Sequence, residues 1–130
     1  MIGLLVLEWG VKLFGLFFVM IVCHEIGHVG YFWGVLDKHP KIRFVRVGFG
    51  LKVLVGEDQD YNGLSERQLS GIYLSGVFAG LVPYFVVGVL TNWNIMFGAM
   101  LLPYAWGSMP DIVRAIDMLK KVKVVEDDES

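Results

Sequence analysis

Three long apolar segments constrain this chain more than any other feature of its sequence. They cover residues 13–35, 69–90 and 95–119. Each is long enough to cross a bilayer as a helix, because crossing ~30 Å of hydrocarbon takes about 20 apolar residues. We therefore expect an α-helical membrane protein with three transmembrane helices, in contact with lipid, and a tight turn at residues 92–94 between the second and third.

The composition fits this class and argues against several others. Hydrophobic residues make up 55% of the 130 residues and charged residues 18%, with a mean hydropathy of +0.60. In soluble domains about 45–50% of the residues are apolar and about 25% are charged. A net charge of −2 without a basic face argues against a nucleic-acid partner. The single cysteine, Cys23, excludes an internal disulfide, and we interpret it as a helix-packing residue.

A polar region between the first two apolar segments predicts a short β-hairpin within residues 41–56. Residues 42–47 and 51–55 are rich in valine, isoleucine and phenylalanine and flank the turn residues Gly48, Phe49 and Gly50. Residues 121–130 are charged and are expected to form a disordered tail. The remaining residues, 1–120, then form a single transmembrane core.

The positions of lysine and arginine predict the orientation. Three spans would put the two termini on opposite sides of the membrane. Lys12 is the only basic residue expected on the N-terminal side, and the others lie in the hairpin region or near the C-terminus. The positive-inside rule then places the hairpin and the C-terminus in the cytoplasm and the N-terminus outside. The start of the chain lacks the basic region and cleavage site of a signal peptide, so we expect it to be retained. Small size and the absence of targeting signals suggest a prokaryotic cell membrane, while the oligomeric state stays open.

The residues that carry chemistry lie near the end of the first segment, in the run His24-Glu25-Ile26-Gly27-His28. Residues four apart share one face of a helix, so both imidazoles can bind one metal ion. Zinc suits imidazole nitrogen, and Glu25 beside the first ligand could act as a general base. The alternative is a pair of hydrogen-bonded histidines. Burying all three polar groups in a spanning helix costs several kcal/mol, which favours the metal site.

A catalytic zinc site takes three protein ligands and keeps one position open, so a third ligand is needed. Asp111 is the only other acidic residue well inside an apolar segment. It lies at a depth similar to that of His28, because each is about eight or nine residues from the cytoplasmic end of its segment. Alternatively, Asp111 caps a helix that resumes at Pro110, or pairs with Arg114. Three further possible ligands lie nearer water and are expected to be solvated instead: Asp37, His39 and Asp117.

Together these motifs resemble the site-2 protease family of intramembrane zinc metalloproteases, over roughly residues 19–118. Residues 42–50, IRFVRVGFG, resemble a strand of the family that ends in GFG, and residues 79–85, AGLVPYF, loosely resemble its AGPxxNF segment. Asp111 is similar in role to the aspartate of its LDG motif. The chain departs from the family pattern at Tyr84, which replaces the asparagine, and at SMPD, which stands where the family has NPxPxLDG.

The resemblance implies a hydrolase that cuts peptide bonds in or near transmembrane segments of membrane proteins, as in regulated intramembrane proteolysis. It implies one Zn²⁺ per chain, with Glu25 as the catalytic base and three ligands: His24, His28 and Asp111. The departures leave the donor to the oxyanion unassigned, and Tyr84 or Ser108 are hypotheses for that role. The partners implied are a transmembrane protein or peptide substrate and the bilayer.

The hairpin suggests how such a substrate could bind. An extended peptide can add to an exposed strand edge through main-chain hydrogen bonds, and the candidate residues are Phe44, Val45, Arg46 and Val47. The alternative is an interfacial amphipathic flap.

Two other functions remain open. A metal transporter would need polar residues along the outer half of the spans, which the sequence lacks, and could dispense with Glu25. A catalytically inactive metal-binding or interaction protein would also not need Glu25.

Overall fold

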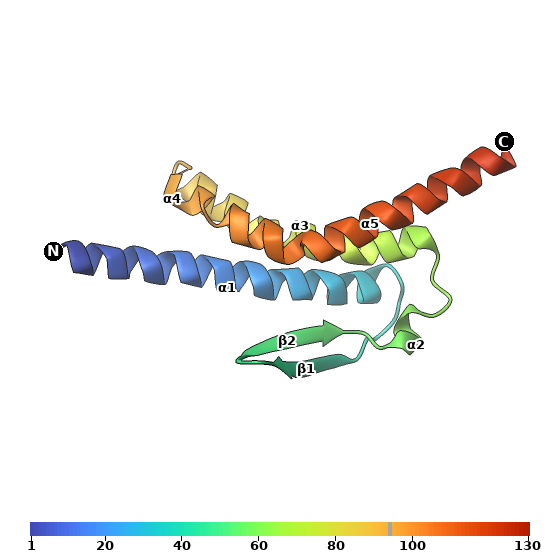
Figure 1. Cartoon of the computed structure of the whole chain (residues 1–130), viewed down its shortest axis with the longest axis horizontal. Coiled ribbons are helices and arrows are strands. Elements are labelled where there is room, and N and C mark those ends of the chain that lie inside the picture. The colour runs from blue at the N-terminus through green and yellow to red at the C-terminus, as the bar shows by residue number, and fades with distance from the viewer. Residues whose placement is uncertain (94) are drawn as a thin grey trace.

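In the computed structural model, residues 1–93 and 95–130 are described, with the backbone alone at 96 and 97. Along the chain the elements are α1 (Ile2–Gly34), β1 (Ile42–Val47), β2 (Gly50–Val55), α2 (Asp58–Tyr61), α3 (Glu66–Leu90), α4 (Ile95–Gly98) and α5 (Leu101–Glu129). The long helices α1, α3 and α5 run along the long axis of the molecule, and the hairpin lies beside α1 (Figure 1). The helical class and the hairpin predicted from the sequence are confirmed.

Two of the described helices, α1 and α3, are long and apolar enough to cross a membrane. At about 1.5 Å per residue, α1 extends about 50 Å and so exceeds the ~30 Å hydrocarbon core. Its first turns carry an exposed ion pair between Lys12 and Glu8, 2.5 Å apart, which suits the interface. Large apolar side chains such as Phe14 and Phe18 are exposed along α1, as lipid-facing residues would be. The third predicted span is not shown, because the corresponding part of α5 carries three charged residues: Asp111, Arg114 and Asp117.

The buried face of α1 is a single stripe with a spacing of four residues, comprising Leu16, Met20, His24, His28 and Phe32. Small residues on α3 let the two helices approach closely. A Cβ atom added at Gly27 of α1 would overlap the backbone of Ser75 and the side chain of Ala79. The two histidines therefore belong to the stripe that packs against α3, and the close helix contact is what buries them.

The hairpin is antiparallel, with a register that pairs Ile42 with Val55 and Val47 with Gly50. Gly48 in the turn has a φ of 60°, in the left-handed region that glycine adopts without strain. Val55 at the end of β2 is buried with Phe32 of α1 and Ile72 of α3, while every residue of β1 is exposed. The hairpin is thus anchored at one end and free along the outer edge of β1.

The short helix α2 lies between the hairpin and α3, where the sequence had predicted no helix or strand. Its first turn is closed by a capping box in which Glu57 and Asp60 each accept a hydrogen bond from the other residue's backbone N–H. Asn92 and Trp93, in the predicted turn after α3, have φ values of 52° and 56°. Asn94 lies outside the described residues.

The C-terminal part of the structure differs from the interpretation of the sequence in two places. Residues 121–130 were expected to be disordered, but α5 continues to Glu129, and Arg67 of α3 forms an ion pair with Glu126. Pro110 was expected to begin a resumed helix, but it lies inside the continuous α5. Proline removes one backbone donor without always ending a helix. Asp111 therefore sits in mid-helix and does not cap a helix N-terminus.

Candidate metal centre

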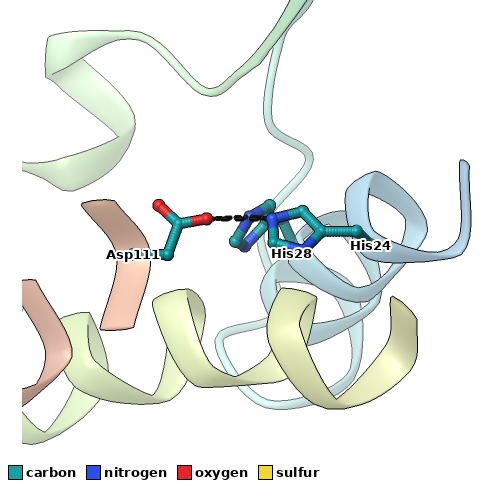
Figure 2. A group of neighbouring side chains, drawn as sticks. All are labelled: His24, His28 and Asp111. Atoms are coloured by element: carbon teal, nitrogen blue, oxygen red, sulfur yellow. Dashed lines mark hydrogen bonds and ion pairs between the residues drawn. The ribbon is translucent and has the colours of Figure 1, made fainter. Parts of the chain in front are cut away.

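The three predicted ligands converge on one point between α1 and α5. Asp111 Oδ2 lies 2.9 Å from His24 Nε2 and 3.3 Å from His28 Nε2, and the two Nε2 atoms are 3.1 Å apart. Figure 2 shows the Asp111 carboxylate pointing at the two imidazole rings. These residues come from positions 87 and 83 residues apart in the chain, so their meeting depends on the tertiary fold.

The triangle formed by these three atoms is close in size to one face of a tetrahedral metal site. Bonds of about 2.0–2.1 Å in a tetrahedral arrangement place neighbouring ligand atoms about 3.3 Å apart. The observed sides of 2.9, 3.1 and 3.3 Å match that value with small adjustments. Both histidines are buried, with 8% of each residue exposed. With three protein ligands, a tetrahedral site would keep its fourth coordination position open. Within the described part of the chain, no other group of three such side chains could hold a metal ion.

Hydrogen bonds behind the two imidazoles orient them toward that point. His28 Nδ1–H donates to the carbonyl oxygen of Ile72 at 2.7 Å. The Tyr104 hydroxyl donates its one hydrogen to the carbonyl of Val77 at 2.8 Å, so it accepts from His24 Nδ1–H at 3.1 Å. Both Nε2 lone pairs are then directed at the third ligand. Two imidazole nitrogens and a carboxylate oxygen in this arrangement could hold a metal ion or share a proton.

Glycines on α3 leave the space that these groups occupy. A Cβ atom at Gly76 would overlap the His28 ring, and a Cβ atom at Gly80 would overlap the Tyr104 hydroxyl. The row of small residues in the second apolar segment thus serves the site as well as the helix contact.

Glu25 is placed to act on a molecule that approaches the centre. It is half-buried and makes no hydrogen bond or ion pair with any described residue. It shares a cavity of about 210 Å³ with His24 and Ser108. An unpaired carboxylate beside a candidate metal centre can take up and return a proton.

A larger cavity of about 930 Å³ lies at the cytoplasmic end predicted from the charges. It is bounded by Arg43 and Glu57 near the hairpin, by Tyr73 on α3 and by Arg114 on α5. None of the three ligand residues lines it. Glu25 lines the smaller cavity and not this one.

The two oxyanion candidates are placed differently. Ser108 on α5 is 2% exposed and lines the cavity that holds Glu25. Tyr84 packs instead in a core cluster with Leu16 and Met20 and does not line that cavity. Of the two candidates, the geometry favours Ser108.

The remaining predicted residues lie away from the centre. The hairpin candidates Phe44, Val45, Arg46 and Val47 belong to the exposed strand β1. The three weaker ligand candidates do not join the triad: Asp37, His39 and Asp117. His39 stacks edge-on against the ring of Trp33, with ring centroids 6.1 Å apart.

Sequence reasoning missed Tyr104, the residue that touches the far side of His24. A usable signal was present, because Tyr104, Ser108 and Asp111 are spaced as i, i+4 and i+7 and so share one face of a continuous helix. The prolines in this segment had suggested a broken helix, which concealed that face.

Comparison with known proteins adds no identification, since no family model, curated protein or solved structure matches this chain. The fold and the site define its class directly. It is a mostly helical chain with two helices able to cross a membrane, a two-stranded sheet, and a buried group of two histidines and an aspartate that could hold a metal ion.

Proposed function

We propose that this protein is an intramembrane zinc metalloprotease, similar to the site-2 protease family, that hydrolyses peptide bonds in or near transmembrane segments. One observation carries the proposal. His24, His28 and Asp111 converge with the spacing of zinc ligands, next to the unpaired carboxylate of Glu25, on a helix able to span a membrane. A hydrolytic site in this position would reach bonds that soluble proteases do not.

Each residue then has a definite role. The two histidines and Asp111 would hold one zinc ion, which would polarise the scissile carbonyl and acidify a water molecule. Glu25 takes a proton from that water as its oxygen attacks the carbonyl carbon. The C–N bond then breaks, and Glu25 returns the proton to the leaving nitrogen, giving an amine and a carboxylic acid. The Ser108 hydroxyl would donate to the carbonyl oxygen as negative charge develops there.

The free edge of β1 supports the binding of an extended substrate. A transmembrane helix must unwind before one of its peptide bonds can be cut, and the unwound backbone needs hydrogen-bonding partners in the membrane. Strand addition to residues 44–47 would supply them. The exposure of all of β1 is the observation that favours this role.

For the membrane arrangement we propose that residues 101–119 of α5 form a third span. Figure 1 has the N-terminus and α4 at one end of the molecule, and α2 and the C-terminus at the other. The placement of the two termini at opposite ends agrees with the distribution of lysine and arginine, which predicts a cytoplasmic hairpin and C-terminus and an external N-terminus. The membrane that we propose is that of a prokaryotic cell.

The alternatives explain fewer features. A metal transporter would need successive ligand groups across the bilayer, whereas the described residues hold one such group. A metal-binding or interaction protein without activity would have no use for an unpaired Glu25 beside the centre. Neither alternative gains support from a separate observation.

The test is cleavage of a model transmembrane peptide by detergent-purified protein, with zinc measured in the same samples. Glu25→Gln should keep about one zinc per chain and lose cleavage by a factor of roughly 10²–10⁴. Glu8→Gln is the matched control, because Glu8 is an exposed carboxylate on the same helix and pairs with Lys12. Equal cleavage by the native chain and Glu25→Gln, or no cleavage by the native chain, would overturn the proposal.

A further inference from the structure

The cavity that holds Glu25 is mostly apolar. Proton transfer by Glu25 would need only space for a water molecule, so the apolar walls call for another explanation. Its walls are Phe17 and Ile21 of α1 and Pro103 and Gly107 of α5, and its polar end is formed by His24, Glu25, Tyr104 and Ser108. On α1 and on α5 these positions form one face each, because they repeat at three or four residues. The cavity is therefore a groove between α1 and α5 that ends at the candidate metal centre.

The groove extends from the centre toward the interior of the proposed membrane. Phe17 and Ile21 precede His24 on α1, and Pro103 and Gly107 precede Asp111 on α5, so both walls lie on the side away from the charged C-terminus. Ile21 is 41% exposed, and both α5 wall residues are also exposed, so the groove opens sideways. A group that enters from the lipid can reach Glu25 along it.

We infer that this groove is a specificity pocket that takes one apolar side chain of the substrate, of leucine, methionine or phenylalanine size, next to the scissile bond. The inference rests on the proposed function. The volume of about 210 Å³ suits a single side chain, since a cavity of about 150 Å³ holds benzene. A lipid acyl chain is the other apolar candidate, but it has no group that would use the carboxylate and imidazole at the polar end.

The pocket can be filled without moving the backbone. A Cβ atom at Gly107 meets no atom within 4 Å, so Gly107→Leu should be accommodated and occupy the groove. Gly10→Leu is the matched control, because Gly10 lies on α1 before the groove and its Cβ position is equally open. Phe17→Ala is a second variant with the opposite effect, since it widens the groove.

The experiment measures binding of peptide hydroxamates to the zinc-loaded full chain in lipid nanodiscs and in detergent. The peptides differ only in the side chain beside the hydroxamate: glycine, leucine, phenylalanine or tryptophan. The native chain and Gly10→Leu should bind the leucine and phenylalanine compounds at least about ten-fold more tightly than the glycine compound. Gly107→Leu should reduce that preference to less than two-fold, while its zinc content and its affinity for the glycine compound stay unchanged. Phe17→Ala should bind the tryptophan compound more tightly than the native chain does.

The outcomes separate this inference from the proposed function. Tight binding without side-chain preference in the native chain, or an unchanged preference in both pocket variants, would overturn the pocket and leave the protease proposal standing. A preference seen in detergent but abolished in nanodiscs would mean that an acyl chain occupies the groove, and would also overturn it. Absence of zinc from the native chain would overturn both.

Discussion

The Tyr104 hydroxyl gives the sharpest prediction about how the centre is built. It accepts a hydrogen bond from His24 Nδ1–H at 3.1 Å while donating to the carbonyl of Val77 at 2.8 Å. Tyr104→Phe removes this one oxygen and leaves the ring in the core. His24 then loses the partner that directs its Nε2 lone pair at the candidate metal centre. Loss of such an outer hydrogen bond lowers metal affinity by roughly 10–100-fold, or about 1.4–2.7 kcal/mol.

The assay is competition for zinc between the purified chain and a chromophoric chelator. Tyr84→Phe is the control, because Tyr84 is also buried but packs against Leu16 and Met20. Nitrogen-15 spectra of histidine in the metal-free protein add a second readout. The Nδ1–H form of His24 should lose population in Tyr104→Phe, while His28, bonded to a backbone carbonyl, keeps its form. Unchanged zinc affinity and unchanged spectra in Tyr104→Phe would refute this reasoning.

Three further changes test separate parts of the molecule. Gly76→Ala puts a methyl group where the His28 ring lies, so zinc affinity should fall by ten-fold or more; native affinity would contradict that packing. Phe44→Pro removes a backbone N–H that points away from β2 in this register, so it should lower cleavage roughly five-fold with zinc retained. Val45→Pro removes an N–H that points toward β2 and so breaks the hairpin itself. Full activity in both variants would exclude strand addition. Burial raises the pKa of Tyr61 to about 12, so the stability from its neutral hydroxyl is complete below about pH 10 and is lost as the pH rises toward 12. In ultraviolet titration, Tyr61→Phe should lose one tyrosine from the late-titrating fraction, and an unchanged late fraction would contradict the burial of Tyr61.

Local patterns in the sequence were enough to predict the parts of the fold that depend on short-range chemistry. The spacing of His24 and His28 places them on one face of any helix, and the strands on either side of Gly48 pair as expected. Depth in the apolar segments was enough to select Asp111 as the third ligand candidate, which the structure brings to the histidines. These inferences needed no knowledge of how the helices pack.

The features that the sequence did not predict depend on tertiary contacts. Tyr104 reaches His24 only because Gly80 leaves room for its hydroxyl, and this requires the packing of α3 against α5. The charge of residues 121–130 suggested a disordered tail. In the structure α5 continues to Glu129, and Arg67 of α3 forms an ion pair with Glu126 on it. Tyr84 stands at the position of the asparagine in the segment that residues 79–85 loosely resemble, yet its side chain packs into the core. Its surroundings therefore depend on the neighbouring helices and not on the motif.

X-ray absorption at the zinc edge, on the purified full chain, reports the metal and its ligand atoms together. We expect one zinc per chain with two imidazoles and only oxygen as further ligands, and loss of an oxygen ligand or of the metal in Asp111→Asn. We expect no sulfur ligand, because Cys23 does not join the group of candidate ligand atoms. A spectrum with sulfur coordination, a centre unaffected by Asp111→Asn, or a chain that binds no zinc would overturn the proposed zinc centre.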